Sequence, residues 1–343
     1  MFAAPPTFEF LVERDLHGIR IDSFLEHHLR NYTKWRLARL VRAGAARIDF
    51  YPVDETRRVA RGECVQVTLF EPPDKLLRPQ PVALPLVYAD HWLMVVNKPA
   101  GVISHPTGEY QTGTLINGLQ YLLNQQTALP GLLRPGVVHR LDRQTSGLMV
   151  VATTHRSHML LASAFEKGRV RKTYLALLEG TLPEDSGSID LPIGRTRFGR
   201  GVLMSARGDA LDRKSATTNY RVLERFPAHT LVEARPLTGR NHQIRVHFAH
   251  IGHPLVGDEF YLPRGAIRSE RSAIRAQRSG LGDDVGGVTT DDIDERDGRH
   301  LLHAARLEFA HPISDLWMTF DSSLPIDFRE QVARARESAQ SRH

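Results

Sequence analysis

The sequence predicts a fold of mixed strands and helices in about two domains. Its 343 residues exceed the usual length of one domain, and 41% of them are hydrophobic, which is enough for each domain to bury a core. Predicted strands and helices also follow one another in a mixed order, without the regular alternation of a parallel α/β fold. We therefore expect two folded domains of mixed strand and helix content.

The charge balance favours a polyanionic partner. Arg and Lys number 45 against 39 acidic residues, for a net charge of +6, and a positive protein attracts polyanions such as structured RNA. No apolar run approaches the roughly 18 residues of a membrane span, and the opening "MFAAPPTFEF" does not resemble a signal peptide. The single cysteine, Cys64, fits a reducing compartment. These features predict a cytoplasmic chain without a membrane partner.

The N-terminal region is expected to hold a small domain. Residues 1–15 read as a loose lead-in, and residues 16–70 read as a compact unit. Helical spacing of apolar residues predicts two short helices before a strand-rich piece, and Gly44 suits the end of the second. The residues expected on their two apolar faces are Phe24, Leu25 and Leu29, then Trp35, Leu37, Leu40 and Val41.

The second of these helices carries four cations and no acid. They are Lys34, Arg36, Arg39 and Arg42. An ordinary solvated face would normally mix charges of both signs, whereas a purely basic ridge is typical of a surface that meets phosphates. We therefore expect these four side chains to bind RNA.

A second domain is expected after a proline-rich linker at 71–85. It would span 86–328, with a mobile insertion at 264–299 and a C-terminal tail at 329–343. Its first elements are a strand at 92–96, a strand in "SGLMVVATT", and a helix from Thr154 to about Lys167. The next strand, "RVRKTYLALLEG", places Lys172, Tyr174 and Ala176 on one face. The aspartates of the insertion lack the spacing of a calcium-binding loop.

The stretch "HRLDRQTSG" sets one carboxylate, Asp142, between Arg140 and Arg143. Neighbouring cations favour the ionised form of an acid, so Asp142 suits a nucleophile or a base better than a proton donor. A hydrolytic pair would need a second carboxyl group of raised pKa, and none follows at short spacing. An ion pair that only braces a loop is the alternative interpretation.

The segment "LTGRNHQIRVHFAHIGHP" predicts a short amphipathic helix that starts at Asn241 and stops at Gly252. Ile244, Phe248 and Ile251 form its apolar face. Basic groups gather at one end of this helix, and such an end suits a carboxylate or a phosphate. They are Arg240, His242 and Arg245. The additional histidines, at 247, 250 and 253, come without cysteines or a metal-binding motif. We expect no metal there.

Five ordered segments resemble the RluA-type pseudouridine synthases. They are "VVNKPAGVISHP", "VVHRLDRQTSGLMVVA", "RKTYLALLEG", "GRNHQIRVHFAHIGHPLVGD" and "LLHAARLEFAHP". Residues 16–70 resemble the small RNA-binding domain, first known from a ribosomal protein, that many members carry. The likeness covers most of the chain. It departs at Asn241, at "ISDLW" after the last His-Pro, and at the long 264–299 insertion.

This resemblance implies an α+β catalytic domain with a largely antiparallel mixed sheet and a central cleft, next to a small α+β RNA-binding domain. It implies isomerisation of specific uridines to pseudouridine by one aspartate, here Asp142, without a cofactor. Three routes stay open: attack on the base, attack on the sugar carbon, or removal of a proton to give a glycal. By the same resemblance Arg245 pairs with the aspartate, Tyr174 packs against the uracil ring, and Arg140 fills the space that a flipped nucleotide leaves.

The expected partner is structured RNA, with ribosomal RNA first and transfer RNA second, and the expected working form is a monomer. Two other functions were weighed. A non-catalytic RNA-binding or ribosome-assembly protein would explain the charge equally well, but the intact set of Asp142, Tyr174 and Arg245 argues against it. A hydrolase with an aspartate nucleophile would act on a small substrate and would have no use for the N-terminal domain.

Overall fold

The computed structural model describes residues 5–70, 78–105, 112–126, 131–196, 203–268 and 299–340. The chain forms two compact units. Unit 1 contains the residues up to Val96 together with Ile103–Arg140 and Val150–Ser163. Unit 2 contains Asn97–Val102, Leu141–Met149 and the residues from Ala164 onward. The units therefore do not divide at the predicted linker, and the Asp142 loop belongs to unit 2.

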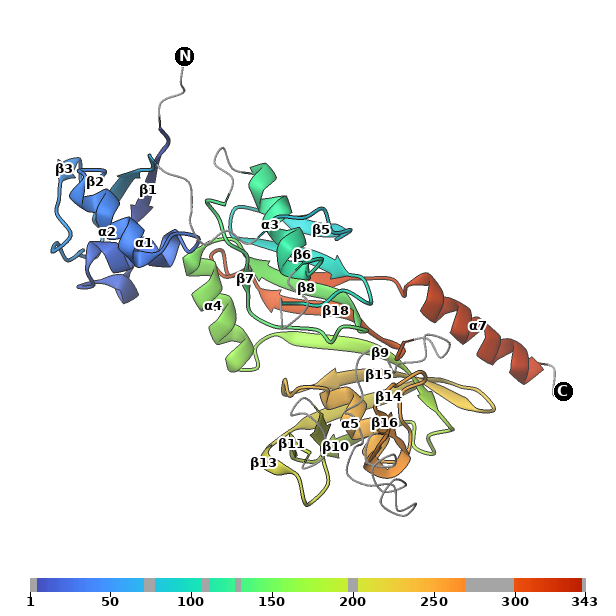
Figure 1. Ribbon diagram of the computed structural model, residues 1–343. Helices are drawn as coiled ribbons and strands as arrows, with labels where there is room; N and C mark the ends of the chain where they lie inside the picture. Colours follow the sequence, from blue (N-terminus) through green and yellow to red (C-terminus); the bar gives the residue numbers. More distant parts are fainter. Residues whose placement is uncertain are drawn as a thin grey trace, which may run out of the picture. The chain divides into compact units, whose positions relative to one another are not determined.

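The N-terminal module of unit 1 is a small antiparallel sheet with two helices (Figure 1). Its strand order is β1-β4-β2-β3. The elements are β1 (Thr7–Leu11), a 3-10 turn (Arg14–Leu16), α1 (Ile21–His28), α2 (Lys34–Arg42), β2 (Ala46–Ile48), β3 (Tyr51–Pro52) and β4 (Cys64–Thr68). The prediction of a loose lead-in was wrong, because β1 pairs with β4 from Thr7 opposite Thr68 to Leu11 opposite Cys64.

The two predicted helices of this module are present. The Thr33 hydroxyl accepts the Arg36 backbone N–H at 3.3 Å and so caps α2. Gly44, with φ of 76°, lies just after the end of α2 and supplies the left-handed conformation that stops a helix. One predicted core residue was wrong: Trp35 is 64% exposed, and the Arg39 guanidinium stacks over its ring at 4.9 Å. The apolar face of α2 is therefore limited to Leu37, Leu40 and Val41.

The rest of unit 1 contains the helix α3, several strands and part of a second helix. Its elements are β5 (Leu86–Ala89), β6 (Leu93–Lys98), α3 (Leu115–Gln126), β7 (Gly136–Val137), β8 (Ser146–Ala152) and α4 (His155–Glu166), of which β6, β8 and α4 extend into unit 2. The described end of the predicted linker is fixed on α3: the Asn117 side chain donates to the Arg78 carbonyl at 2.8 Å, and Leu84 is buried. Residues 71–77 lie outside the described part.

Unit 2 is built on a largely antiparallel mixed sheet, as expected. The strand order is β10-β14-β15-β9-β18 with β19 beside β18, all antiparallel, while the start of β8 pairs in parallel with β18. The strands are β9 (Arg171–Glu179), β10 (Ser186–Asp190), β14 (Thr217–Arg225), β15 (His229–Pro236), β18 (Leu302–Ala310) and β19 (Trp317–Asp321). The α+β prediction is thereby confirmed.

Two helices cover opposite faces of this sheet: α5 (Gln243–His250) and α7 (Ile326–Gln340). In β9, Ala176 joins the core that contains Phe248 of α5, whereas its neighbour Leu177 joins the core that contains Phe328 of α7. Successive strand residues point to opposite faces, so the two cores lie on the two sides of the sheet. The predicted C-terminal tail was therefore wrong from 329 to 340, because α7 buries Val332 in a core.

Smaller strands complete unit 2. They are β11 (Ile193–Arg195), β12 (Met204–Ser205), β13 (Leu211–Lys214), β16 (Tyr261–Leu262) and β17 (Ala266–Ile267). A 3-10 turn at Pro263–Gly265 joins β16 to β17, so the first residues of the predicted insertion are ordered. Its mobility was predicted for residues that lie mostly outside the described part. Among the described helices, none is long and apolar enough to span a membrane.

Gly147 is where the Asp142 loop enters the sheet, and it touches another strand. It has φ of 119°, and a Cβ atom on it would overlap the backbone N and O of Ala304 in β18. The parallel pairing of β8 and β18 therefore requires glycine here, both for backbone conformation and for space.

We predict that Gly147→Ala lowers the free energy of unfolding by about 3 kcal/mol, because the methyl group must displace the backbone of β18. Denaturant unfolding of the full chain measures this. Gly208→Ala is the matched control, since its Cβ would meet no atom within 4 Å, and it should change stability by less than about 0.5 kcal/mol. Equal effects of the two substitutions would contradict the close contact.

Candidate active site

Asp142 lies on the loop that precedes β8 in unit 2. The Thr145 backbone N–H donates to the Asp142 carbonyl at 3.1 Å and closes a turn. The Thr145 hydroxyl is hydrogen-bonded to His300 Nε2 at 2.8 Å, which ties the turn to the residue just before β18. The Asp142 side chain is 19% exposed. A substrate can thus reach a carboxylate whose backbone is fixed.

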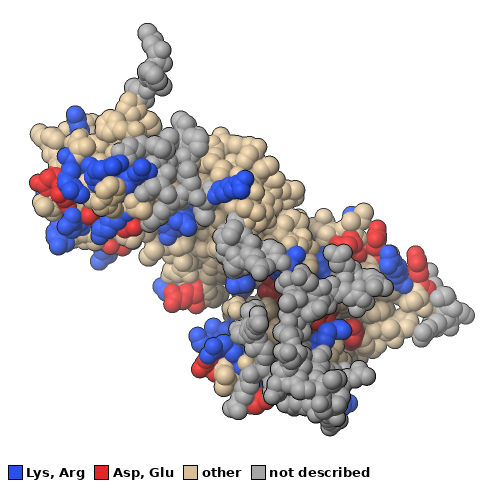
Figure 2. Space-filling model, in the orientation of Figure 1, with Lys and Arg blue, Asp and Glu red and all other residues tan. Residues whose placement is uncertain are grey.

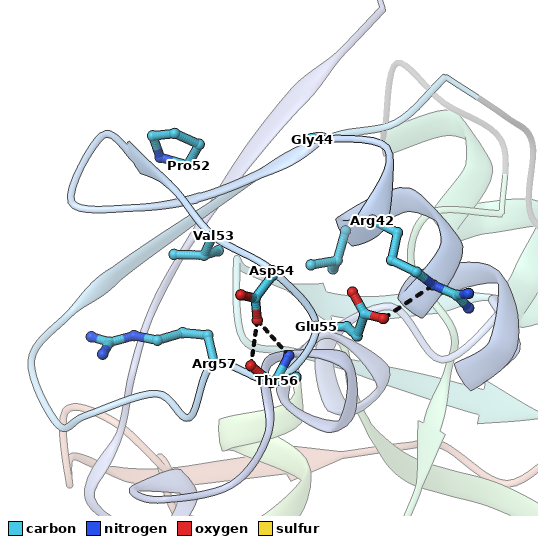
Figure 3. Close-up of a pocket in the computed structure, with 9 residues that line it drawn as sticks. Arg42, Gly44, Pro52, Val53, Asp54, Glu55, Thr56 and Arg57 are labelled. Carbon is cyan, nitrogen blue, oxygen red and sulfur yellow. Dashed lines mark hydrogen bonds and ion pairs between the residues drawn. The ribbon is translucent and has the colours of Figure 1, made fainter.

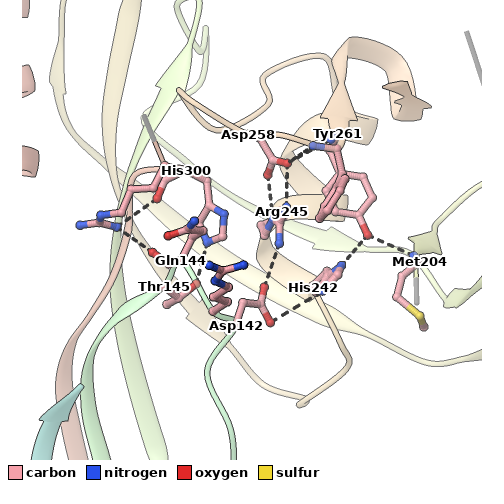
Figure 4. A network of polar contacts seen from close by, with 12 residues as sticks. Asp142, Gln144, Thr145, Met204, His242, Arg245, Asp258, Tyr261 and His300 are labelled. Atoms are coloured by element: carbon pink, nitrogen blue, oxygen red, sulfur yellow. Dashed lines mark hydrogen bonds and ion pairs between the residues drawn. The ribbon is translucent and has the colours of Figure 1, made fainter. Parts of the chain in front are cut away.

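Arg245, in the first turn of α5, bridges two carboxylates (Figure 4). Its Nη1 donates to Asp142 Oδ2 at 3.2 Å, while Nε and Nη2 donate to the two oxygens of Asp258 at 2.8 Å each. The Arg245 side chain is only 2% exposed. A buried guanidinium must be paired to offset its loss of hydration, and here the two aspartates share it.

Asp258 is the fixed end of this bridge. Besides both Arg245 bonds, its Oδ1 accepts the backbone N–H groups of Phe260 and Tyr261, each at 3.0 Å. Burial alone would raise the pKa of Asp258, but the Arg245 charge and hydrogen bonds outweigh burial and lower it to about 2. Asp258 therefore stays ionised and holds the guanidinium in one orientation.

His242 approaches Asp142 from the same end of α5. Its Nε2 lies 3.9 Å from Asp142 Oδ1, and its Nδ1 is hydrogen-bonded to the Tyr261 hydroxyl at 2.7 Å. His242 itself is the N-terminal flanking residue of α5, in a left-handed conformation with φ of 53°. The prediction that Asn241 starts the helix was thus displaced by one residue. Ile251, predicted on the apolar face, is 37% exposed.

The electrostatics of the site keep Asp142 charged. Burial by itself would raise the pKa of the Asp142 carboxyl, but the positive charges of His242 and Arg245 outweigh burial and hold the pKa below its usual value. The sequence prediction of an ionised acid agrees with this direction. The largest lowering effects come from His242, Arg245 and His300, which are distant in the sequence, and not from the flanking Arg140 and Arg143 that the sequence suggested.

Tyr174 lies in β9 between Ala304 of β18 and Ala234 of β15. Its ring is partly buried against the core that contains Phe248. Burial and the nearby Asp142 carboxylate both raise the pKa of the Tyr174 phenol, so its hydroxyl stays protonated at neutral pH. Lys172, two residues earlier, is partly buried, and burial lowers its pKa.

Two basic side chains donate to the backbone of the Asp142 loop. Arg299 Nη1 donates to the Gln144 carbonyl at 3.0 Å, while its Nε pairs with Asp327 at the start of α7. The fully buried Lys98 donates to the Arg143 carbonyl at 3.0 Å, and burial lowers the pKa of Lys98 to about 7. These contacts fix the two residues that follow Asp142 in the loop.

The remaining predicted binding residues have contacts within their own units. Arg240 turns to the Ser215 carbonyl, which its Nε contacts at 2.9 Å. Arg140 is exposed in unit 1, where its charge helps lower the pKa of His105 after the larger effect of burial. The four cations of the basic ridge are in α2 of unit 1, and there Arg42 meets an acid, Glu55, at 3.5 Å.

The other histidines of α5 have structural contacts. His247 is buried and bonds Thr218 through Nδ1 at 2.9 Å and the Leu191 carbonyl through Nε2 at 3.0 Å. Within the described ranges, no cluster of three or more His, Cys, Asp or Glu side chains could hold a metal ion.

Sequence reasoning missed Asp258, Tyr261, His300 and Lys98. Asp258 closes the quoted segment "GRNHQIRVHFAHIGHPLVGD", and an acid at the end of a strongly basic segment was the available signal. His300 gave no signal, because it is brought to Thr145 only by the pairing of β18 with β8.

Comparisons with known proteins agree with one another. A family model described as RNA pseudouridylate synthase matches residues 92–250. An uncharacterized RNA pseudouridine synthase of Bacillus subtilis is 34% identical, over 93% of this chain and 95% of that protein. Ribosomal large subunit pseudouridine synthase D of Neisseria meningitidis is 36% identical, over 96% and 82% of the two chains, and that of Pseudomonas aeruginosa is 34% identical, over 95% of both.

Two solved structures are similar as well. The human protein RNA pseudouridylate synthase domain containing 4 is 26% identical, with a TM-score of 0.54 over 74% of this chain and 93% of that one. The human protein RNA pseudouridylate synthase domain containing 1 is 27% identical, with a TM-score of 0.50 over 78% and 98% of the two chains.

We predict that Asp258→Asn destabilises the fold by about 3 kcal/mol at neutral pH, because it leaves the buried Arg245 with half its pairing. The folded pKa of Asp258, about 2, is below the unfolded value near 3.9. Its charge therefore stabilises fully above about pH 5, and this stability is lost as the pH falls from about 4 through 2.

Denaturant unfolding of the parent and the Asp258→Asn variant between pH 7 and pH 3 measures this difference. It should be constant above pH 5 and shrink below pH 4. Asp209→Asn, at an exposed aspartate, is the control and should show almost no difference. A gap that is independent of pH would contradict an ionised Asp258.

Proposed function

This chain belongs to the RNA pseudouridylate synthase family, and from that premise we propose that it converts particular uridines of ribosomal RNA to pseudouridine with Asp142 as the essential carboxylate. The observation that carries the proposal is the bond from the buried Arg245 to Asp142, because it holds a solvent-accessible carboxylate in its charged form.

A single carboxylate fits the chemistry. Isomerisation detaches the uracil from its ribose, turns it, and rejoins it through carbon, so every atom of the substrate is retained and no hydrolytic water is activated. Attack on the base, attack on the sugar and removal of a proton all require the ionised aspartate. In this proposal His242 and Arg245 keep the aspartate ionised, and neither a metal ion nor a cofactor takes part.

We assign Tyr174 to the uracil ring and Arg245 to the aspartate. The detached base must be held and yet turn, which a flat aromatic face permits better than several directed hydrogen bonds. The Tyr174 ring is partly buried and its hydroxyl stays neutral beside Asp142. His242 and Arg240 are assigned to the RNA around the target nucleotide, and Arg140 to the space that the flipped nucleotide leaves in the RNA.

Ribosomal RNA is the proposed substrate because two of the relatives described above are named for the large ribosomal subunit. The basic ridge of α2 is an argument for a long RNA substrate, because it offers phosphate contacts outside the candidate active site. Figure 2 shows Lys and Arg side chains gathered over the N-terminal module. We propose the cytoplasm as the location and a single chain as the working form. A hydrolase of small substrates does not fit membership of an RNA-modifying family.

We predict that Asp142→Asn abolishes pseudouridine formation while the melting temperature and the RNA affinity stay close to those of the parent. The change removes the carboxylate but little volume, and Arg245 keeps Asp258. Pseudouridine mapping of ribosomal RNA from cells that carry each variant measures the loss. Asp185→Asn, at an aspartate with an 89% exposed side chain, is the matched control. Turnover near the parent rate in Asp142→Asn would refute the catalytic role.

We predict that the triple substitution Arg36→Ala, Arg39→Ala and Arg42→Ala raises the KM for long RNA and leaves the maximal rate nearly unchanged. Each lost phosphate contact should flatten the dependence of log affinity on log salt by about 0.9 of slope. A charge-matched control replaces the exposed Arg329, Arg334 and Arg336 of α7. If both triple variants bind alike, the ridge is only a solvated helix face.

A further inference from the structure

Two aromatic side chains stand in solvent at the turn between β2 and β3. Phe50 is 72% exposed and Tyr51 is 76% exposed, which makes them the most exposed large hydrophobic residues of the described chain. Burial of such rings normally stabilises a small module. This module instead leaves both rings in water.

The backbone at this turn makes Phe50 more unusual. Ile48 pairs with Tyr51, so Asp49 and Phe50 are the two central residues of the hairpin loop. Both have positive φ, 47° and 72°, as a type I′ turn requires. Asp suits the first position, but the second favours glycine, and a bulky side chain in the left-handed region is costly. Neither burial nor backbone preference explains a phenylalanine here.

We propose that Phe50 and Tyr51 form a stacking platform for unpaired nucleotides of the RNA, a role that rests on the proposed function and extends it. Aromatic side chains that stack on bases accept any sequence, because every base has a flat face, and they require the bases to be out of a duplex. The platform would thus select single-stranded or looped RNA beside the segment that the basic ridge holds.

The turn lies among charged groups of both signs, which suits a polar partner better than an apolar protein surface: the acids are Asp49, Asp54 and Glu55, and the cations are Arg42, Arg47 and Arg57. Arg47, in β2, is exposed directly across from Pro52, the residue after Tyr51. The stretch from Pro52 to Arg57 and the end of α2 at Arg42 line one hollow in the module's surface (Figure 3). The basic ridge therefore ends at the hollow that the platform borders, and an RNA strand bound along the ridge would present its bases to the platform.

The substitution Phe50→Gly separates binding from folding. It removes the ring and also supplies the residue that the positive φ favours, so the melting temperature should equal or exceed that of the parent. Phe50→Tyr keeps an aromatic ring at the same place and should restore binding. Leu11→Ala is the matched control, because it shortens another apolar side chain of the module that is 61% exposed.

The test measures the affinity of the full chain for two RNAs of about 16 nucleotides, the upper site size of one single-strand-binding module. One is a single strand without self-pairing, and the other is a blunt duplex of the same length. Phe50→Gly should weaken single-strand binding by at least about fivefold, with duplex affinity and salt slope unchanged. Phe50→Tyr and Leu11→Ala should stay within about twofold of the parent, a change below 0.5 kcal/mol at room temperature.

Three results would overturn the platform. They are unchanged single-strand affinity in Phe50→Gly, an equal loss for the duplex, or a Phe50→Tyr variant that binds as poorly as Phe50→Gly. Unchanged RNA affinity would also be the result if the turn met a protein instead. Asp142→Asn in the same assay should keep its affinity. The catalytic proposal is tested separately by pseudouridine formation: turnover near the parent rate in Asp142→Asn would refute it and would leave the binding result readable.

Discussion

The candidate active site depends on one buried cation that two carboxylates share. Arg245 is fixed by both oxygens of Asp258 and offers a single N–H to Asp142. A charge pair 4 Å apart is worth about 4 kcal/mol at an effective dielectric constant of 20, while burial of an ion costs several kcal/mol. The single hydrogen bond from Arg245 therefore does not by itself determine whether Asp142 is ionised. His242, 3.9 Å away, supplies the second positive neighbour, and together they keep the carboxylate ionised and accessible.

The fold meets this constraint by fixing each member from a different element. Asp142 comes from the loop before β8, Arg245 from the first turn of α5, and Asp258 from the segment between α5 and β16. The phenyl ring of Phe260 and the phenol of Tyr261 cover the Arg245 guanidinium at 5.5 and 5.1 Å. Behind the loop, Lys98, Arg299 and His300 bond its backbone and Thr145, so the donors are arranged before any substrate binds. Such preorganisation avoids rearrangement during the reaction.

The N-terminal module follows a different physical logic. Its core is formed by α1, α2 and a four-stranded sheet. Because that core stabilises the module, the surface can hold exposed aromatic residues that do not contribute to the stability of the fold. Trp35 stands in water under Arg39, and Phe50 holds an unfavourable backbone conformation. Strain and exposed apolar surface concentrate where a protein meets its ligand. The proposed site chemistry requires rigid pairing, whereas the RNA recognition proposed for this module requires accessible charge and flat rings.

The sequence by itself determined the local elements and the chemical types. The helices at 21–28, 34–42 and 155–166 and the strands β8 and β9 follow from periodicity, caps and glycine stops, and the ionised state of Asp142 was predicted in direction. Only the tertiary structure decided which groups meet. Arg245 lies 103 residues from Asp142 and bonds Asp258, 13 residues on, more closely. The strand β1, predicted as part of a loose lead-in, pairs with β4, and most of α7, predicted as a C-terminal tail, packs on the sheet core. Periodicity reports a residue's own turn or strand, while pairing across the fold depends on neighbours that the local sequence does not contain.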